Sequence, residues 1–311
     1  MQGADTIEGH KRIMSPKTNA GIALLAVAVC SAATVVWLRI HSGRPSALFT
    51  HRTAEAVEKQ KVATTGPFAT KDFSSKKVPG TDKPVGDVKA EIAGMPLKTG
   101  EVLEFTANVS KLSNVASLQV SVVERRSFLG KTVWHLQATA HTENPLRMVF
   151  ALDDQFDSYS DAGALTSLQY EMHLNERGQK VESVQRMMTS GRAPADATAA
   201  MVLPGTRDPL GMLEYLRSVD WANSGEVRSP VYDGRKLYDV RARLTGSAEK
   251  VTVPAGNYIT SKIELRVFDN GTEMKDSHFF LYLANNSTRS PVLLEALLPF
   301  ADARVELVKS Q

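Results

Sequence analysis

The chain has 311 residues, of which 42% are hydrophobic and 23% are charged, a composition typical of a globular protein that buries a sizeable core without metals or disulfides. Its formal net charge of +3 comes from 37 basic and 34 acidic side chains, so the strongly basic balance of nucleic-acid-binding proteins is missing and we expect no nucleic-acid partner. The single cysteine, Cys30, lies in an N-terminal apolar stretch, which excludes a disulfide framework and a thiol nucleophile downstream.

An uncharged apolar stretch lies between Lys17 and Arg39. It is long enough to cross a hydrocarbon core of about 30 Å as a helix, and Trp37 suits a membrane interface. We therefore predict a single transmembrane signal-anchor helix over residues 20–40, through which the protein contacts the membrane, after a cytoplasmic tail over residues 1–19.

Two other interpretations of this stretch remain, a cleaved signal peptide and a lipoprotein signal with Cys30 as the acylated residue. Small residues at 31–33 would allow cleavage, but the apolar run at 35–38 is unlike a mature N-terminus. Val29 stands where a lipoprotein signal needs a small residue. We favour the uncleaved anchor. Basic residues are balanced on the two flanks, so charge alone does not decide its orientation.

Residues 41–97 lack hydrophobic periodicity and are rich in lysine, threonine and proline. This composition predicts a disordered linker with an end-to-end distance of roughly 40 Å. Its lysines suit a solvated chain, or contact with anionic lipid or an acidic envelope polymer.

From Gly100 onward, apolar and polar residues alternate with period two, which predicts strands that bury one face. Two-residue hairpin signals, such as Asp233-Gly234 and Asn270-Gly271, indicate mostly antiparallel connections. The expected strands cover 101–107, 117–122, 132–140, 146–152, 167–174, 179–187, 236–244, 258–267, 278–283, 292–298 and 303–308.

A helix is expected after Asp208-Pro209, where a capping side chain precedes a proline at the first helical position. The number of expected strands is larger than one flat sheet usually holds. The predicted fold of residues 98–311 is mainly β, a curved antiparallel sheet or barrel-like β-roll with this one short helix covering an opening.

A series of short motifs follows in order along residues 100–300. They are Gly100-Glu101, residues 153–161, Tyr170-Glu171, residues 176–178, Asp208-Pro209-Leu210, Tyr215-Leu216-Arg217, residues 230–238, residues 253–258, Pro291-Val292 and Leu298-Pro299-Phe300. Together these motifs resemble the bacterial exported-protein family catalogued as domain of unknown function 3108. The resemblance implies a β-dominated exported domain without established catalytic residues, and with the anchor it predicts a single-pass inner-membrane protein with its C-terminal domain in the periplasm.

Acidic residues cluster at Asp153, Asp154 and Asp157, and these three are the candidate ligands for a hard cation such as calcium. The alternative is that Asp153 and Asp154 lie in a turn and Asp157 faces solvent at a strand end. The histidines, including His135 and His141, lack zinc-site spacing. We expect no cofactor.

Aromatic side chains could line an apolar cavity or fill the core. We predict a non-enzymatic binding module for an apolar or amphiphilic envelope ligand, such as a lipid, or for an envelope protein. The alternative is a hydrolase of an envelope polymer that uses carboxylates such as Asp154 and Glu171 as acid and base. The candidate ligand-binding residues are Phe150, Phe156, Tyr159, Tyr170, Tyr215 and Tyr232.

Overall fold

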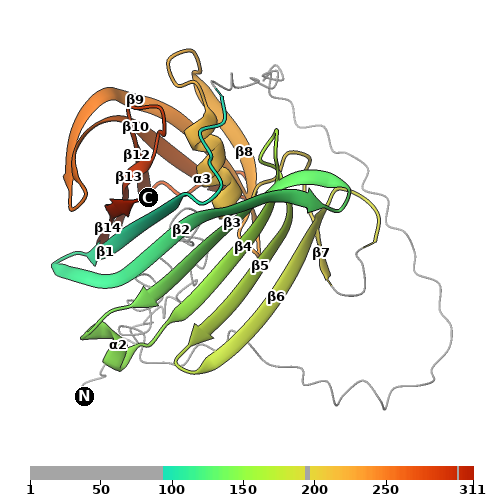
Figure 1. Ribbon diagram of the computed structural model, residues 1–311, viewed down its shortest axis with the longest axis horizontal. Coiled ribbons are helices and arrows are strands. Elements are labelled where there is room, and N and C mark those ends of the chain that lie inside the picture. Colours follow the sequence, from blue (N-terminus) through green and yellow to red (C-terminus); the bar gives the residue numbers. More distant parts are fainter. Residues whose placement is uncertain (1–93, 193–196, 300) are drawn as a thin grey trace, which may run out of the picture.

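The computed structural model describes residues 94–192, 197–299 and 301–311 (Figure 1). The predicted tail, membrane helix and nearly all of the linker therefore lie outside the described residues, and those predictions stay predictions. Within the described ranges, no helix has both the length and the apolar character needed to cross a membrane.

Fourteen strands form one sheet, in the order β7-β6-β5-β4-β3-β2-β1-β14-β13-β12-β10-β9-β8, with β11 beside β10. Neighbouring strands are antiparallel except β6 and β7, which are parallel. The strands are β1 (Val102–Val109), β2 (Leu112–Phe128), β3 (Lys131–Thr142), β4 (Asp153–Asp161), β5 (Ser167–Glu176), β6 (Gln179–Met188), β7 (Thr198–Met201), β8 (Glu226–Tyr232), β9 (Leu237–Val253), β10 (Gly256–Asp269), β11 (Thr272–Glu273), β12 (His278–Ala284), β13 (Pro291–Leu298) and β14 (Ala301–Ser310).

The sheet is strongly curved but it does not close into a barrel, because β7 and β8 at its two ends do not pair. The residues just before helix α3 (Pro209–Ser218) link strand β5 to strand β8, which lie far apart in the order of the sheet. Ser167 donates its backbone N–H to the Thr206 carbonyl (3.0 Å), and the Arg207 N–H donates to the Pro230 carbonyl (3.0 Å). The predicted curved antiparallel sheet is confirmed in outline, while a closed roll is not formed.

Helix α3 lies inside the curve, between the strands β2–β6 and the strands β8–β10 (Figure 1). All ten of its residues are buried, so it is a core element rather than a surface cover. Its N-cap is the expected Asp208, whose side chain accepts from the Gly211 N–H at 2.8 Å. Gly211 permits close packing, because a Cβ there would lie 2.8 Å from the Ser160 hydroxyl oxygen.

The last turn of α3 holds a buried arginine, Arg217. Its guanidinium donates to both carboxylate oxygens of Glu101, to Glu214 and to the Thr288 carbonyl. These bonds join the start of β1, the helix and the β12–β13 connection, which explains how a helix with two charged residues is buried on every side.

The segment 146–152, expected to be a strand, forms the connection between β3 and β4. Its first part is the short helix α2 (Leu146–Val149), and β3 pairs directly with β4 from His141 opposite Asp153. Because two paired strands need a reversal between them, these apolar residues cannot extend the sheet. The expectation that Asp153 and Asp154 lie in a turn is wrong as well, since β4 is continuous from Asp153.

Candidate functional site

The candidate site lies on the face of β1–β6 that is turned away from α3. Along β4 the side chains alternate between faces, as in any strand. Ser158 points to the helix side, where its hydroxyl donates to Asp208 at 2.5 Å. Asp157 points to the other side, towards its cross-strand neighbours Gln137 on β3 and Glu171 on β5.

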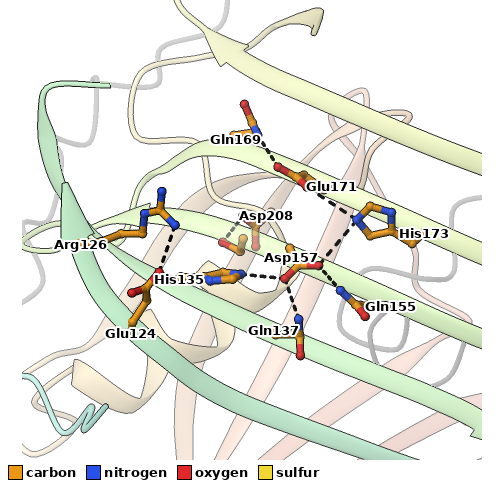
Figure 2. A network of polar contacts seen from close by, with 11 residues as sticks. Glu124, Arg126, His135, Gln137, Gln155, Asp157, Gln169, Glu171, His173 and Asp208 are labelled. Atoms are coloured by element: carbon orange, nitrogen blue, oxygen red, sulfur yellow. Dashed lines mark hydrogen bonds and ion pairs between the residues drawn. The ribbon is translucent and has the colours of Figure 1, made fainter. Parts of the chain in front are cut away.

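Asp157 is the centre of a network on this face (Figure 2). Its Oδ1 lies 2.7 Å from His135 Nε2 and accepts from Gln137 Nε2 at 2.9 Å. Its Oδ2 accepts from Gln155 Nε2 at 2.7 Å and lies 3.7 Å from His173 Nε2. The surrounding side chains leave Asp157 only 4% exposed.

These contacts set the charge of Asp157. Burial raises its pKa, but the hydrogen bonds from His135, Gln155 and Gln137 together outweigh burial and hold the pKa below its usual value. Asp157 is therefore an ionised acceptor whose lone pairs are already occupied, and it is poorly suited to donate a proton to a substrate.

His173 links Asp157 to two further carboxylates. Its Nε2 lies 3.6 Å from Glu171 Oε2, and its Nδ1 contacts Glu182 on β6. Burial lowers the pKa of His173, but the hydrogen bond and charge of Glu182, with the charges of Asp157 and Glu171, raise it above its usual value. A histidine with a raised pKa is thus shared by three carboxylates and stabilises their negative charge.

A hollow of about 590 Å³ lies on the same face over β1, β2 and β3. Polar side chains from alternate strand positions face it, and they bring hydroxyl, amide, imidazole and carboxylate groups. The polar residues that line it are Glu104, Thr106, Asn114, Ser117, Gln119, Thr139, His141, Glu143 and Asn144.

The strand register joins the hollow to the Asp157 network. One row of directly paired residues crosses the strands from Glu104 through Gln119, Thr139 and Gln155 to His173. Glu104, Gln119 and Thr139 line the hollow, whereas Gln155 donates to Asp157. The hollow and the network are therefore two parts of one polar surface.

Stacked rings border the network on its other side. The Tyr159 ring lies between Phe128 (centroids 4.5 Å apart) and His135 (4.7 Å), and both pairs are nearly parallel. Arg186 lies over the Phe128 ring, 5.6 Å from its centroid. Rings held in this way form a rigid, half-buried platform next to the hydrogen-bonding groups.

The interior between α3 and the sheet contains a small apolar void. The apolar void there has a volume of about 20 Å³, room for about one water molecule. Its lining includes Phe105, Leu118, Leu210 and Leu213. In this conformation, that space does not hold a lipid chain.

The structure separates the three predicted metal ligands. Asp153 and Asp157 share the outer face, but Asp153 is held by both Nη atoms of Arg147 at 2.8 Å. Asp154 is on the opposite face, where it accepts from the Asn175 N–H at 2.9 Å. No group of three His, Cys, Asp or Glu side chains suited to a metal ion occurs in the described ranges. Burial raises the pKa of Asp154 to about 7.

The same alternation separates the carboxylates suggested for a hydrolase. Glu171 pairs with Asp157 across the strands and shares its face of the sheet, while Asp154 lies on the opposite face. Asp154 and Glu171 therefore do not face one pocket, as an acid and a base acting on one bond would have to.

The six predicted aromatic ligand residues do not gather around one cavity. Phe150, Phe156, Tyr170 and Tyr215 belong to the hydrophobic core, and Tyr232 is half-buried at the end of β8. Tyr159 alone of the six lies in the stacked platform. Ligand binding by these residues stays a prediction.

The glutamines and threonines of the polar surface were not among the predicted site residues. Gln137, Gln155, Gln119 and Thr139 match no catalytic or metal motif. The signal that could have found them is the period-two alternation of β2, β3 and β4, which places polar side chains from three strands on one face.

Comparison with known proteins supports the family resemblance. The model of the family described as "Protein of unknown function (DUF3108)" matches residues 104–308. No curated protein matches the chain.

Three solved structures are distantly similar. A β-barrel-like protein of domain of unknown function DUF1849 from Brucella abortus has 11% identity and a TM-score of 0.42, over 68% of this chain and 95% of that one. A chain named "putative lipoprotein" from Parabacteroides distasonis has 11% identity and a TM-score of 0.35, over 70% and 97%. A chain named "putative exported protein with YmcC-like fold" from Bacteroides fragilis has 10% identity and a TM-score of 0.27, over 71% and 99%.

Proposed function

This chain belongs to the DUF3108 family, whose function is unknown, and we propose that it is a non-enzymatic binding module of the bacterial envelope. It binds a neutral glycan segment, either of an envelope polymer or of the sugar head group of an amphiphile, on the outer face of β1–β5. It is anchored in the inner membrane by residues 20–40 and works in the periplasm. The observation that carries the proposal is the continuity of the hollow with the Asp157 network.

The dimensions of the surface suit an oligomer. From Asp153 to Tyr159 along β4 it extends about 20 Å, and from β1 to β5 about 19 Å, given the usual rise per residue and strand spacing. Three directly paired rows of polar residues cross it, which begin at Thr106, Glu104 and Ser121. A chain of several sugar units would meet donors and acceptors along its whole length.

The chemistry of the surface suits a neutral ligand. Amides, hydroxyls and imidazoles both donate and accept, which matches hydroxyl groups. The charged side chains are mostly satisfied within the protein, as in the pairs of Arg126 with Glu124 and of Lys309 with Glu104. The stacked rings of Phe128, Tyr159 and His135 add a rigid apolar border beside the hydrogen-bonding groups.

The geometry favours binding over hydrolysis. Asp157 is ionised and fully hydrogen-bonded, and Asp154, whose pKa burial raises to about 7, is on the other face. An apolar ligand in the interior would have to displace α3, which is held to the sheet at one end by the bond from Ser158 to Asp208 and at the other by the pair of Arg217 with Glu101.

The test uses the full chain in lipid nanodiscs and N-acetylated glycan oligomers as the probe, with affinity measured by calorimetry. Thr139→Trp fills the hollow at a half-buried strand position that tolerates an aromatic side chain. Thr245→Trp on β9 is the matched control, because Thr245 is exposed and lies outside the hollow.

We expect saturable binding that Thr139→Trp weakens by at least about tenfold, as for loss of a central contact, and that Thr245→Trp leaves unchanged. Absence of binding by the unaltered chain, or an equal loss in both variants, would contradict the proposal. Capture of a lipid or a protein on the same face instead would support the other ligand classes expected from the sequence.

A further inference from the structure

One end of the sheet carries an exposed apolar tip with basic residues around it. Met148, Val149 and Leu112 are 80%, 65% and 61% exposed, the highest values of the large hydrophobic side chains in the described ranges. We define the tip as residues 110–112, helix α2 and residues 177–180, which form the β1–β2 turn with the start of β2, the β3–β4 connection, and the β5–β6 turn with the start of β6.

Hydrogen bonds hold the residues on both sides of α2 against their neighbours in the sheet. The Glu143 N–H, just before α2, donates to the Val115 carbonyl of β2 at 2.9 Å. The Arg177 N–H donates to the Ala151 carbonyl, just after α2, at 2.7 Å. Figure 1 shows α2 beyond the ends of the strands, away from α3. The tip is therefore one surface that projects from the sheet.

Arg147 fixes the base of α2 and leaves its apolar residues outside. Its guanidinium is held by Asp153 and also reaches the Thr142 carbonyl at 3.4 Å. Because Arg147 folds back onto the strand ends, Met148 and Val149 point into solvent although burial would stabilise them.

Three exposed basic residues, Lys111, Arg177 and Lys180, lie around these side chains. Of the acidic residues nearby, Glu143 accepts from the Ser117 hydroxyl at 2.7 Å, and Glu176 is half-buried at the end of β5. Asp302, whose carbonyl accepts from the Ser110 N–H at 2.7 Å, is exposed beside the β1–β2 turn. Apolar side chains flanked by basic ones match the boundary between acyl chains and anionic head groups.

We infer that the tip docks into the head-group region of a bilayer that contains anionic lipid. Met148, Val149 and Leu112 enter the boundary with the acyl chains, while Lys111, Arg177 and Lys180 contact lipid phosphates. This docking uses described residues alone and is independent of glycan binding, because the tip lies outside the hollow and the Asp157 network. A bound membrane fixes the orientation of the polar face relative to the bilayer.

The experiment places a polarity-sensitive dye on the full chain in a Cys30→Ser background. Met148→Cys carries the dye at the tip, and Ser287→Cys carries it at an exposed turn between β12 and β13 as the control. The vesicles are phosphatidylcholine with phosphatidylglycerol, and a nitroxide on the acyl chains quenches dyes that enter the bilayer. Since Met148 is 80% exposed, its substitution leaves the core intact.

We expect a blue shift at position 148 and quenching at least about fivefold stronger there than at position 287. Lys111→Glu with Arg177→Glu and Lys180→Glu should weaken the effect by more than about tenfold, since each basic side chain contributes about fivefold near an anionic surface. Equal quenching at both positions would overturn the inference. Quenching that is unchanged without phosphatidylglycerol, or a blue shift without quenching, would also overturn docking to anionic lipid.

Discussion

Replacement of Arg217 by methionine should destabilise the fold strongly. Arg217 has 0% side-chain exposure, and its ion pairs with Glu101 and Glu214 are both 2.8 Å long. Methionine fills much of the same volume but leaves Glu214, 2% exposed, without its cation. Breaking a buried pair by removing one partner costs about 3–5 kcal/mol, and we expect a loss of this size.

The loss should depend on pH. Burial raises the pKa of Glu214 to about 7 even beside Arg217. Because that pKa is raised in the folded state, the contribution of Glu214 to stability is fully present at low pH and lost as pH rises through about 7. Without Arg217 the pKa rises further, so Arg217→Met should cost more at about pH 8 than at about pH 5.

The assay is urea unfolding of the full chain in non-ionic detergent, followed by tryptophan fluorescence. Trp221 reports on α3, because its Nε1 donates to the Leu216 carbonyl at 2.9 Å. Arg243→Met is the control, since the ion pair of Arg243 with Glu264 is largely exposed and should contribute less than about 1 kcal/mol. Equal losses in Arg217→Met and Arg243→Met would refute the reasoning.

Two further predictions concern stability. Burial raises the pKa of Asp154 from 3.8 to about 7. The contribution of Asp154 to the free energy of unfolding is therefore fully present below about pH 4 and is lost as pH rises through about 7. The variant Asp154→Asn keeps an oxygen that can accept the hydrogen bond from the Asn175 N–H, and at about pH 8 it should be more stable than the unaltered chain by at most about 4 kcal/mol. Equal urea midpoints of the two proteins at that pH would count against the burial of a charge at position 154. Gly234→Ala and Gly271→Ala should each cost about 1–2 kcal/mol, because their φ values of +91° and +79° strain an alanine. A Cβ at position 234 would lie 2.5 Å from Met172 Cε, but this flexible end of the side chain can move aside, so a much lower urea midpoint for Gly234→Ala than for Gly271→Ala would contradict the reasoning.

Local patterns in the sequence predicted much of the fold. Alternation along β1, β2 and β3 indicated strands, and the Asp208-Pro209 pair located the start of α3. The acidic run at the start of β4 was misjudged, because aspartate is rare in strands and common in turns. Its cross-strand partners, which determine its structure, belong to other segments of the chain.

The candidate site could not be assembled from the sequence because it depends on register. Asp157 meets His135 and Gln137 only in the observed pairing of β3 with β4, and a shift by one residue would move it to the other face. The complete burial of α3 was also hidden, since Glu214 and Arg217 read as surface residues unless their pairing is known. The small volume of the void between α3 and the sheet, about 20 Å³, follows from that burial.

Histidine footprinting tests the glycan-binding face most directly. Diethyl pyrocarbonate acylates accessible imidazoles, and mass spectrometry gives the rate at each histidine of the full chain in nanodiscs. His141 lines the hollow with its side chain 50% exposed, while His278 is exposed at the start of β12, outside the hollow. With N-acetylated glycan present, the proposed function predicts slower acylation of His141 and an unchanged rate at His278. Unchanged acylation of His141 at saturating glycan would contradict it.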